Sequence, residues 1–175
     1  ILNWIERDLR KISDAARRIG HGELNVALNL KRQDEIGQLG QSFMTMQHQL
    51  GTDALTGVSN RRGFAARLHQ RMRPGPAGAV AGFAILLIDL DHFKQVNDAM
   101  GHPAGDAVLI EVAERIRACF GAQDTVARLG GDEFAVIIDG SSTTAELEAR
   151  LQAVEAAVVQ ASHRVDPEAL VATGF

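Results

Sequence analysis

Residues 128 to 138 read Arg-Leu-Gly-Gly-Asp-Glu-Phe-Ala-Val-Ile-Ile, and the architecture around them follows from this segment. Two apolar runs, Thr125–Leu129 and Phe134–Ile138, flank a glycine pair. This predicts two strands joined by a tight hairpin, because glycine reaches positive φ without steric cost. The turn also carries two adjacent acids, Asp132 and Glu133, which repel each other and add nothing to a core. A solvated acidic turn explains them if the hairpin is taken alone, whereas a bound cation explains them if a second acidic cluster lies nearby.

A second acidic cluster follows an apolar run that starts at Phe83 and has the pattern of a strand buried on both faces. The run ends in Asp89-Leu90-Asp91. If this strand neighbours the hairpin, the carboxylates of Asp89 and Asp132 meet at one edge of the sheet. Hard oxygen ligands of this kind suit Mg²⁺, which keeps several waters and shares its coordination sphere with substrate phosphates. The two clusters together predict a magnesium site.

Groups that suit a nucleotide follow directly after this cluster. The amides of His92, Phe93 and Lys94 open a predicted helix, and a helix N-terminus attracts anions. Lys94 adds a mobile positive charge, although the chain contains no GxxxxGK[ST] phosphate loop. Asn97 and Asp106 are candidates for the same pocket, since an amide and a carboxylate match the donors and acceptors of guanine. Asp106 is equally well explained as the cap of the helix that follows it.

Composition limits the class of protein. The chain has 175 residues and a formal net charge of −4, with +1 in residues 1–50 and −5 in the remainder. This length suits one medium domain with a smaller module. No basic patch or aromatic platform is present, so nucleic acid is not an expected partner. No run of about twenty apolar residues is present either. The single cysteine, Cys119, excludes an internal disulfide and falls on an apolar stripe, which predicts core packing.

Residues 1–50 contain two apolar seams with heptad spacing, each predicted to lie on a helix. The seam residues are Ile5, Leu9, Ile12, Ala16 and Ile19, followed by Ile36, Leu39, Phe43, Met46 and Leu50. The alternation of leucine and valine over residues 24–30 predicts a short half-buried strand. Because the connector of residues 20–33 is long enough to run back along the first helix, the two helices are expected to lie parallel. Two copies of the module would then form a four-helix bundle.

With Asp34-Glu35-Ile36-Gly37 at the start of the second helix, residues 1–50 resemble a HAMP domain. HAMP domains are signal-relay modules found just inside the membrane in bacterial receptors. The resemblance implies an all-α parallel four-helix bundle in a homodimer. It also implies a transmembrane segment upstream of this chain, and a place at the cytoplasmic face of the bacterial inner membrane. A generic dimerising coiled coil is the alternative.

Residues 51–175 are expected to form the second domain. The order of its strands, helices and hairpin predicts an α+β fold, with an antiparallel-containing sheet and packed helices, rather than a doubly wound fold. The sequence of residues 101–105 predicts a loop, and that of Ala169–Phe175 predicts the beginning of one more strand. Arg61 and Arg62 are expected to cap a helix or to form ion pairs rather than to bind phosphate.

Four motifs of this domain resemble those of GGDEF-domain diguanylate cyclases. They are Asp53-Ala54-Leu55-Thr56-Gly57 with Asn60-Arg61-Arg62, the segment from Asp89 to Asp98, Gly101-His102-Pro103-Ala104-Gly105-Asp106, and Gly130-Gly131-Asp132-Glu133-Phe134. The resemblance covers residues 53–175. It implies a nucleotidyl-cyclase-like sheet and an enzyme that joins two GTP molecules into cyclic di-GMP with release of pyrophosphate. Two such domains would face each other in a dimer, each holding one GTP.

The resemblance also implies roles for individual residues. Asp89, the Leu90 carbonyl and Asp132 would bind Mg²⁺, with Mn²⁺ as an alternative, and Asp132 would help to deprotonate the 3′-hydroxyl. Glu133 would support the metal site, and Lys94 would stabilise charge on the reacting phosphate. The substrate-binding residues would be His92, Phe93, Asn97, His102 and Asp106. The reaction would be an in-line phosphoryl transfer that depends on positioning and metal electrostatics.

Three features depart from the family pattern. The product-inhibition site needs an Arg-x-x-Asp sequence, but the arginine position holds Gly121 while Asp124 is present. Feedback inhibition is therefore expected to be weak or absent, because the site needs a bidentate guanidinium. The chain ends before the Lys and Arg that hold the GTP phosphates in the family, so a C-terminally incomplete domain with poor or no activity is expected. The second helix runs almost directly into Asp53, which predicts tight coupling between the modules.

Three functions are weighed. A cyclic di-GMP-producing enzyme, regulated through the HAMP module by a membrane sensor, is favoured by the complete 130–134 motif together with Asp89 and Lys94. A non-catalytic module that binds GTP and controls a downstream domain, such as a phosphodiesterase, is the alternative. A purely structural relay comes third, and failure to bind GTP would indicate it.

Overall fold

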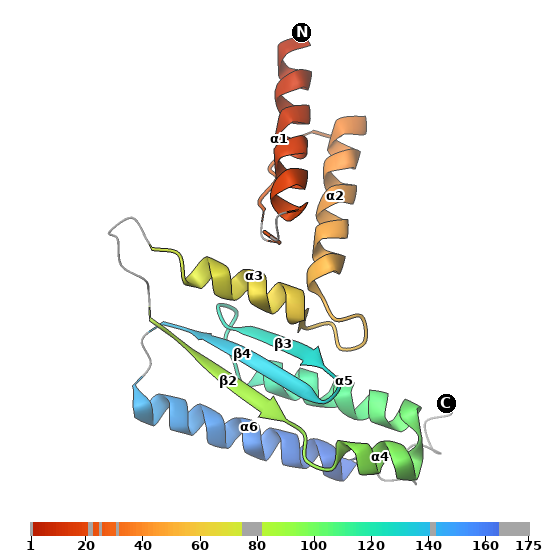
Figure 1. The fold of residues 1–175 in the computed structure, drawn as a ribbon, viewed down its shortest axis with the longest axis vertical. Helices are drawn as coiled ribbons and strands as arrows, with labels where there is room; N and C mark the ends of the chain where they lie inside the picture. The colour runs from red at the N-terminus through yellow and green to blue at the C-terminus, as the bar shows by residue number, and fades with distance from the viewer. Residues whose placement is uncertain are drawn as a thin grey trace.

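The computed structural model describes residues 2–20, 23–24, 26–30, 32–74, 82–140 and 143–164. Along the chain these residues form α1 (Leu2–Gly20), α2 (Glu35–Gly51), β1 (Ser59–Asn60), α3 (Arg61–Arg71), β2 (Phe83–Asp89), α4 (Phe93–Met100), α5 (His102–Ala118), β3 (Thr125–Gly130), β4 (Glu133–Asp139) and α6 (Thr144–Arg164) (Figure 1). The expected α+β class is confirmed. The strand predicted at Ala169–Phe175 lies outside the described residues.

The described strands form one mixed sheet in the order β1-β3-β4-β2. β4 pairs antiparallel with both β3 and β2, while β1 pairs parallel with β3. The predicted hairpin is therefore present, and the strand before the second acidic cluster is its neighbour. In the β2–β4 register Asp89 lies opposite Glu133, so the end of β2 reaches the hairpin turn.

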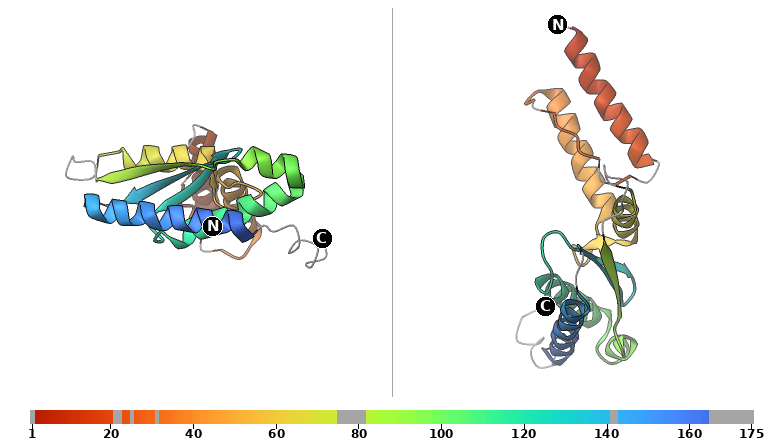
Figure 2. Two further views of the ribbon diagram at one scale, coloured as in Figure 1. Left: turned by 90° about the horizontal axis from the view of Figure 1, so that it is seen from below. Right: turned by 90° about the vertical axis from the view of Figure 1, so that its left-hand side faces the viewer.

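Helices cover both faces of the sheet, with α3 on one face and α5 with α6 on the other (Figure 2). The larger core lies under α5 and α6 and includes Phe134, Val136 and Ile138 from β4. The smaller core lies under α3, where Phe64 packs on Ala135 and its neighbours. β4 is buried on both faces from residue 134 to 138, which explains the unbroken apolar sequence after the acids.

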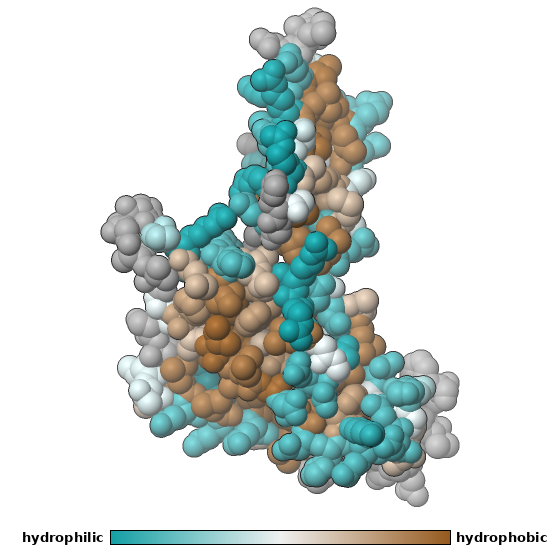
Figure 3. Space-filling view, viewed as in Figure 1, coloured by the Kyte–Doolittle hydropathy of each residue, from teal (hydrophilic) through white to brown (hydrophobic). Residues whose placement is uncertain are grey.

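β2 is the last strand at its end of the sheet among the described residues. Ala84, Leu86 and Ile88 pack on the larger core, whereas Ile85 and Leu87 on the opposite face remain 45% and 69% exposed. Figure 3 shows a hydrophobic area over this part of the molecule. The prediction that this strand is buried on both faces is therefore wrong for the described chain, because the core under α3 includes only Phe83 of β2 and leaves Ile85 and Leu87 exposed.

The N-terminal module consists of α1 and α2, which lie side by side and run in the same direction, as predicted (Figures 1 and 2). Ala15, Ile19, Leu24 and Val26 are its buried apolar residues. The described part of residues 23–30 forms no strand, so that prediction is wrong. Leu24 and Val26 are buried against helices, which offer no backbone partner for a ladder, and a side chain, Gln47 Nε2, donates to the Leu24 carbonyl at 2.5 Å.

Arg32 joins the connector to both helices of this module. Its guanidinium lies over the Trp4 ring of α1, 4.0 Å from the centroid, and 3.3 Å from an Asp8 carboxylate oxygen. It also pairs with Asp34, whose side chain caps α2 by accepting from the Gly37 amide at 3.2 Å. Hydrogen bonding from Arg32 lowers the pKa of Asp34 to about 2. The network fixes the N-terminus of α2 against α1.

Candidate functional site

The hairpin turn places the two adjacent acids and is held from two sides. Gly130 and Gly131 have φ values of 149° and 55°, which side chains rarely adopt, so glycine is required in this turn. Arg128 Nε donates to the Gly131 carbonyl at 2.8 Å. The same guanidinium lies 3.4 Å from Asp53 Oδ1, which also accepts from the Thr56 hydroxyl at 2.6 Å.

Asp53 therefore anchors the hairpin turn rather than a ligand. Burial opposes ionisation of its carboxyl group, but hydrogen bonds from Thr56 and the charge of Arg128 outweigh it, and the pKa of Asp53 is lowered. The sequence analysis assigned no role to Asp53 or Arg128. The Asp-x-x-Thr spacing is typical of a turn in which the aspartate side chain accepts hydrogen bonds from the threonine, so it could have identified the role of Asp53. The partner of Arg128 is 75 residues away in the sequence, and no local pattern indicates it.

The predicted metal ligands differ from the structural acids in having no partner. Among the described residues, neither Asp89 nor Asp132 forms a side-chain hydrogen bond or an ion pair. By contrast, Asp53, Asp124 and Asp139 are each bound by an arginine. Free carboxylate oxygens beside a turn are available to a cation, and carboxylates with water and phosphate oxygens satisfy Mg²⁺. The described residues contain no group of three or more His, Cys, Asp or Glu side chains arranged for a metal, so two carboxylates must share it with other oxygens.

The backbone between Asp89 and α4 is fixed and unusual. The Leu90 side chain is 7% exposed, and the Leu90 carbonyl accepts from the Phe93 amide at 3.3 Å. This bond takes up one of the three amides expected to bind phosphate, while the amides of His92 and Lys94 have no backbone acceptor in the described residues. His92 has φ 64°, and no other non-glycine residue in the described ranges has positive φ. Such a conformation is sterically unfavourable and is found preferentially at functional sites.

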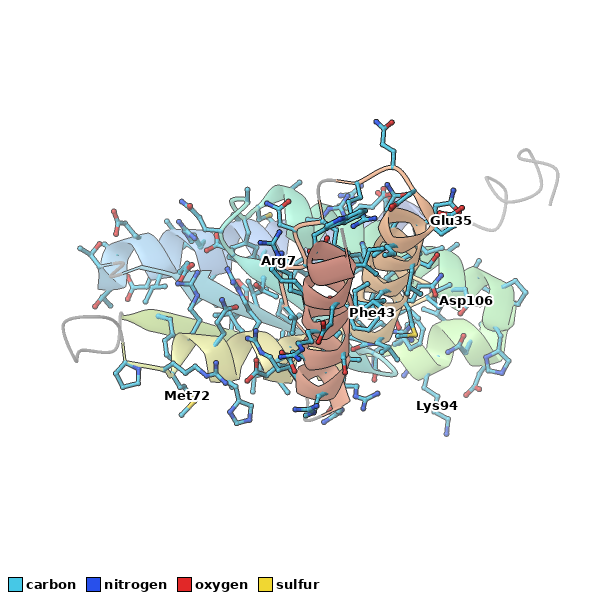
Figure 4. The ribbon with its side chains drawn as sticks, turned by 90° about the horizontal axis from the view of Figure 1, so that it is seen from above. Arg7, Glu35, Phe43, Met72, Lys94 and Asp106 are labelled. Atoms are coloured by element: carbon cyan, nitrogen blue, oxygen red, sulfur yellow. The ribbon has the colours of Figure 1, made fainter. Side chains whose placement is uncertain are left out.

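Lys94 extends away from the body of the protein at the start of α4 (Figure 4). It is exposed and forms no ion pair within the described part of the chain. Its charge is therefore available to a ligand that approaches this end of the sheet. Asp89, Asp91 and His92 line one end of a groove of about 1110 Å³ between β2 and α6, which is otherwise mainly apolar. Asp132 and Asn97 lie outside this groove, so the predicted residues do not share one closed cavity.

Asn97 packs on Gly105, the residue before Asp106, where α4 packs on α5. A Cβ atom added at Gly105 would overlap Asn97 Oδ1 and would lie 2.9 Å from its Cγ, so the amide rests directly on the first turns of α5. α5 begins at His102 with Gly101 as its N-cap residue. The predicted loop at residues 101–105 is therefore mostly helical, and the interpretation of Asp106 as the cap is wrong. Asp106 is exposed, and His102 is exposed at the start of the same helix.

Arg61 contacts the hairpin directly. Its Nε donates to the Leu129 carbonyl at 2.9 Å, and its NH2 lies 3.4 Å from Glu133 Oε2. The expectation that Arg61 forms ion pairs is confirmed, but no sequence signal indicated that its partner is the second acid of the turn. Asn60 caps α3 by accepting from the amides of Arg62 and Gly63, at 3.0 and 2.9 Å.

Family models and known proteins match both parts of the chain. The model for "Diguanylate cyclase, GGDEF domain" matches residues 50–173, and the HAMP domain model matches residues 2–52. Diguanylate cyclase TpbB of Pseudomonas aeruginosa is 40% identical over 122 residues, which cover 59% of this chain and 28% of the relative. The cyclic di-GMP phosphodiesterase NbdA of the same species is 38% identical over 137 residues, which cover 78% of this chain and 16% of the relative. The matched region is thus less than a third of either relative.

A solved structure has a similar fold over part of the chain. The coiled coil and GGDEF domain of DgcB from Caulobacter crescentus, in complex with c-di-GMP, is 28% identical with a TM-score of 0.63. The similarity covers 69% of this chain and 62% of DgcB.

Proposed function

The chain belongs to the GGDEF family of diguanylate cyclases and carries a HAMP domain before its GGDEF domain, and from this we propose that it synthesises cyclic di-GMP from two GTP molecules. The observation that carries the proposal is the pair of unpartnered carboxylates, Asp89 and Asp132, at the complete Gly130–Phe134 turn. Asp53, Asp124 and Asp139 are each bound by an arginine, whereas these two carboxylates are available to a cation. The chain spans less than a third of TpbB and of NbdA, so the activity is proposed for the whole protein that contains it.

The proposed reaction forms one phosphodiester bond in each half. The 3′-hydroxyl of one GTP attacks the α-phosphorus of the other, pyrophosphate leaves, and a second identical step closes the ring. Asp89, Asp132 and the Leu90 carbonyl are the residues that would hold Mg²⁺ or Mn²⁺, which supplies charge neutralisation to the phosphates. Asp132 lies at the turn where it can accept the hydroxyl proton, and Glu133 supports the same site. The side chain of Lys94 and the backbone amides of His92 and Lys94 would bind the phosphates.

Base recognition is assigned to the α4–α5 junction. Asn97, held by its contact with Gly105, and the exposed carboxylate of Asp106 together offer a donor and acceptors to the edge of guanine. His102 lies at the start of the same helix, and we place it beside the substrate.

Dimerisation through the HAMP helices is part of the proposal. In the described chain, large apolar side chains on α1 and α2 remain exposed, namely Trp4, Leu9, Leu39, Met44 and Met46. Three of these belong to the predicted heptad seams (Leu9, Leu39 and Met46). A second copy of the parallel helix pair would cover them and complete a four-helix bundle.

The proposed setting is the cytoplasmic face of the bacterial inner membrane, where the HAMP domain would relay a signal from a membrane sensor. No helix in the described ranges is long and apolar enough to cross a membrane.

The test is nucleotide chromatography of the full-length protein after incubation with GTP and Mg²⁺. Cyclic di-GMP should appear with the wild-type protein and vanish in Asp132→Ala. If GTP binds and is not converted, the alternative function gains support, in which the domain senses GTP and controls a downstream domain. The similarity to NbdA, a phosphodiesterase, favours keeping this second candidate.

A further inference from the structure

The HAMP and GGDEF domains meet along α3, and the first contact is at the start of that helix (Figure 1). Asn60 Nδ2 donates to the carbonyls of Leu50 and Thr52, at 3.1 and 3.0 Å, while Asn60 Oδ1 caps α3. One side chain therefore binds the end of α2 and the beginning of α3. The backbones also touch, because a Cβ atom added at Gly63 would lie 3.1 Å from the carbonyl carbon of Gly51.

The second contact lies in the middle of α3, where Ala66 packs against the buried cluster of the HAMP domain. That cluster includes Leu24 and Val26 of the connector, which are 8% and 3% exposed. A residue of the GGDEF domain thus helps to close the HAMP core. Separating the domains would expose this apolar surface to water, which is unfavourable.

The third contact lies beyond the end of α3. Arg73 NH2 is 2.9 Å from Glu23 Oε1 in the connector, and Arg18 Nε of α1 donates to Glu23 Oε2 at 2.8 Å. Hydrogen bonds from Arg73, which has the largest effect, and from Arg18 lower the pKa of Glu23. An exposed ion pair alone contributes little to stability. Here the network lies at the rim of the apolar contact and links α1, the connector and the end of α3.

The opposite side of α3 holds the catalytic hairpin. Phe64 and Leu68 pack on the sheet beneath the helix. At its first residue, Arg61 binds the Leu129 carbonyl and approaches Glu133. The helix that carries the HAMP contacts therefore also contacts the turn with the proposed catalytic acids.

We propose that α3 transmits the state of the HAMP domain to the catalytic hairpin, with Arg61 as the positioning residue at the hairpin. The functional meaning rests on the proposed cyclase activity, whereas the mechanical coupling does not. Packed contacts rearrange between discrete states rather than deforming continuously. A new packing of α1, α2 and the connector must either move α3 or open the contact between Ala66 and the buried cluster of the HAMP domain. Moving α3 changes the position of Arg61 relative to Leu129 and Glu133.

The first experiment compares hydrogen exchange of the full-length protein with that of Ala66→Lys, which breaks the central contact. Ala65→Lys is the matched control, because Ala65 is the neighbouring residue on α3 and is exposed. We expect amides of the hairpin, residues 129–134, to exchange at least threefold faster in Ala66→Lys and at the wild-type rate in Ala65→Lys. Faster exchange confined to the HAMP domain and α3, with an unchanged hairpin, would overturn the proposal.

A milder pair of variants repeats the test without altering the packed contact. Arg73→Gln removes the ion pair with Glu23, and Arg62→Gln removes an exposed arginine of α3 that has no ion pair among the described residues. Hairpin exchange should rise in Arg73→Gln alone. Equal effects in both variants would show a general response to lost charge and would contradict the coupling.

Arg61→Gln tests the transmission step. If coupling runs through Arg61, the double variant Arg61→Gln/Ala66→Lys should show no faster hairpin exchange than Arg61→Gln alone, whereas independent effects would multiply. Multiplied effects would exclude Arg61 as the positioning residue. GTP conversion by the same proteins gives a separate result. A wild-type protein without conversion would reject the proposed function and leave the exchange result standing.

Discussion

Gly105→Ala should weaken GTP binding without unfolding the protein. The added methyl carbon would lie 2.9 Å from Asn97 Cγ and 3.2 Å from the Phe93 ring. Ordinary carbon contacts are about 3.5–4.0 Å long, so Asn97 must move away from α5 by roughly 0.6 Å or more. The loss of one hydrogen bond to the base costs about 0.5–1.5 kcal/mol, which corresponds to a rise in Kd of about 2- to 12-fold.

The stability of Gly105→Ala should change little, because two effects oppose each other. Alanine in a helix is favoured over glycine by about 0.5–1 kcal/mol. The displacement of Asn97 and of the Phe93 ring acts in the other direction. Thermal unfolding should therefore report a small shift, and titration with a non-hydrolysable GTP analogue should report the weakened binding.

Two variants decide whether the reasoning holds. In Gly121→Ala the new methyl would lie 3.7 Å from Asp124 Oδ2, an ordinary contact, so this variant should bind the analogue as the wild type does. Asn97→Ala should weaken binding at least as much as Gly105→Ala. Wild-type affinity in Gly105→Ala together with a loss in Asn97→Ala would refute the positioning role of Gly105. Wild-type affinity in both would refute the base contact itself.

Three further predictions concern other parts of the chain. His92→Asn should raise the free energy of unfolding in denaturant titration, because the short polar side chain of asparagine can hydrogen-bond locally in the left-handed region; an unchanged or lower value would contradict this. Pairing with Arg32 lowers the pKa of Asp34 to about 2 in the folded protein. This pairing stabilises the fold at pH values above the pKa of Asp34 in the unfolded chain, and the stabilisation is lost as the pH falls towards 2. Acid titration of Asp34→Asn should accordingly show a weaker decline between pH 4 and 2 than the wild type. Cyclic di-GMP should inhibit GTP conversion weakly or not at all. Position 121 holds glycine where the inhibition site needs arginine, and the Asp124 carboxylate is already bound by Arg150. Inhibition at low-micromolar cyclic di-GMP would contradict this prediction.

Local patterns in the sequence predicted the elements that depend on local chemistry. The glycine pair and its flanking apolar runs predicted the hairpin, and the parallel course of α1 and α2 followed from the length of the connector. Asp89 was predicted at the end of an apolar strand, and its meeting with Asp132 was predicted on the condition that this strand lies next to the hairpin. The paired β2 and β4 confirm it.

The predictions that failed depended on partners distant in sequence. The alternating residues 24–30 have the pattern of a strand, but their neighbours in the fold are helices, so side-chain burial occurs without a ladder. Asp106 follows a Gly-Pro-containing segment that signals a loop, yet proline is tolerated in the first turn of a helix, and α5 starts four residues earlier at His102. The roles of Arg61 and Arg128 depend on which strand end the chain brings beside them. No local pattern contains that information.

The contact between Ala66 and the HAMP core has a consequence for recombination between proteins that carry a HAMP domain before a GGDEF domain. A chimera joined at residue 52, where the two family matches meet, would pair the core of one HAMP domain with an unrelated α3 surface. A graft that extends through residue 74 would keep Asn60, Ala66 and Arg73 with their own partners. Evolutionary exchange between proteins would then transfer α1 and α2 together with α3. The boundary of the exchanged segment would lie inside the GGDEF domain rather than before it.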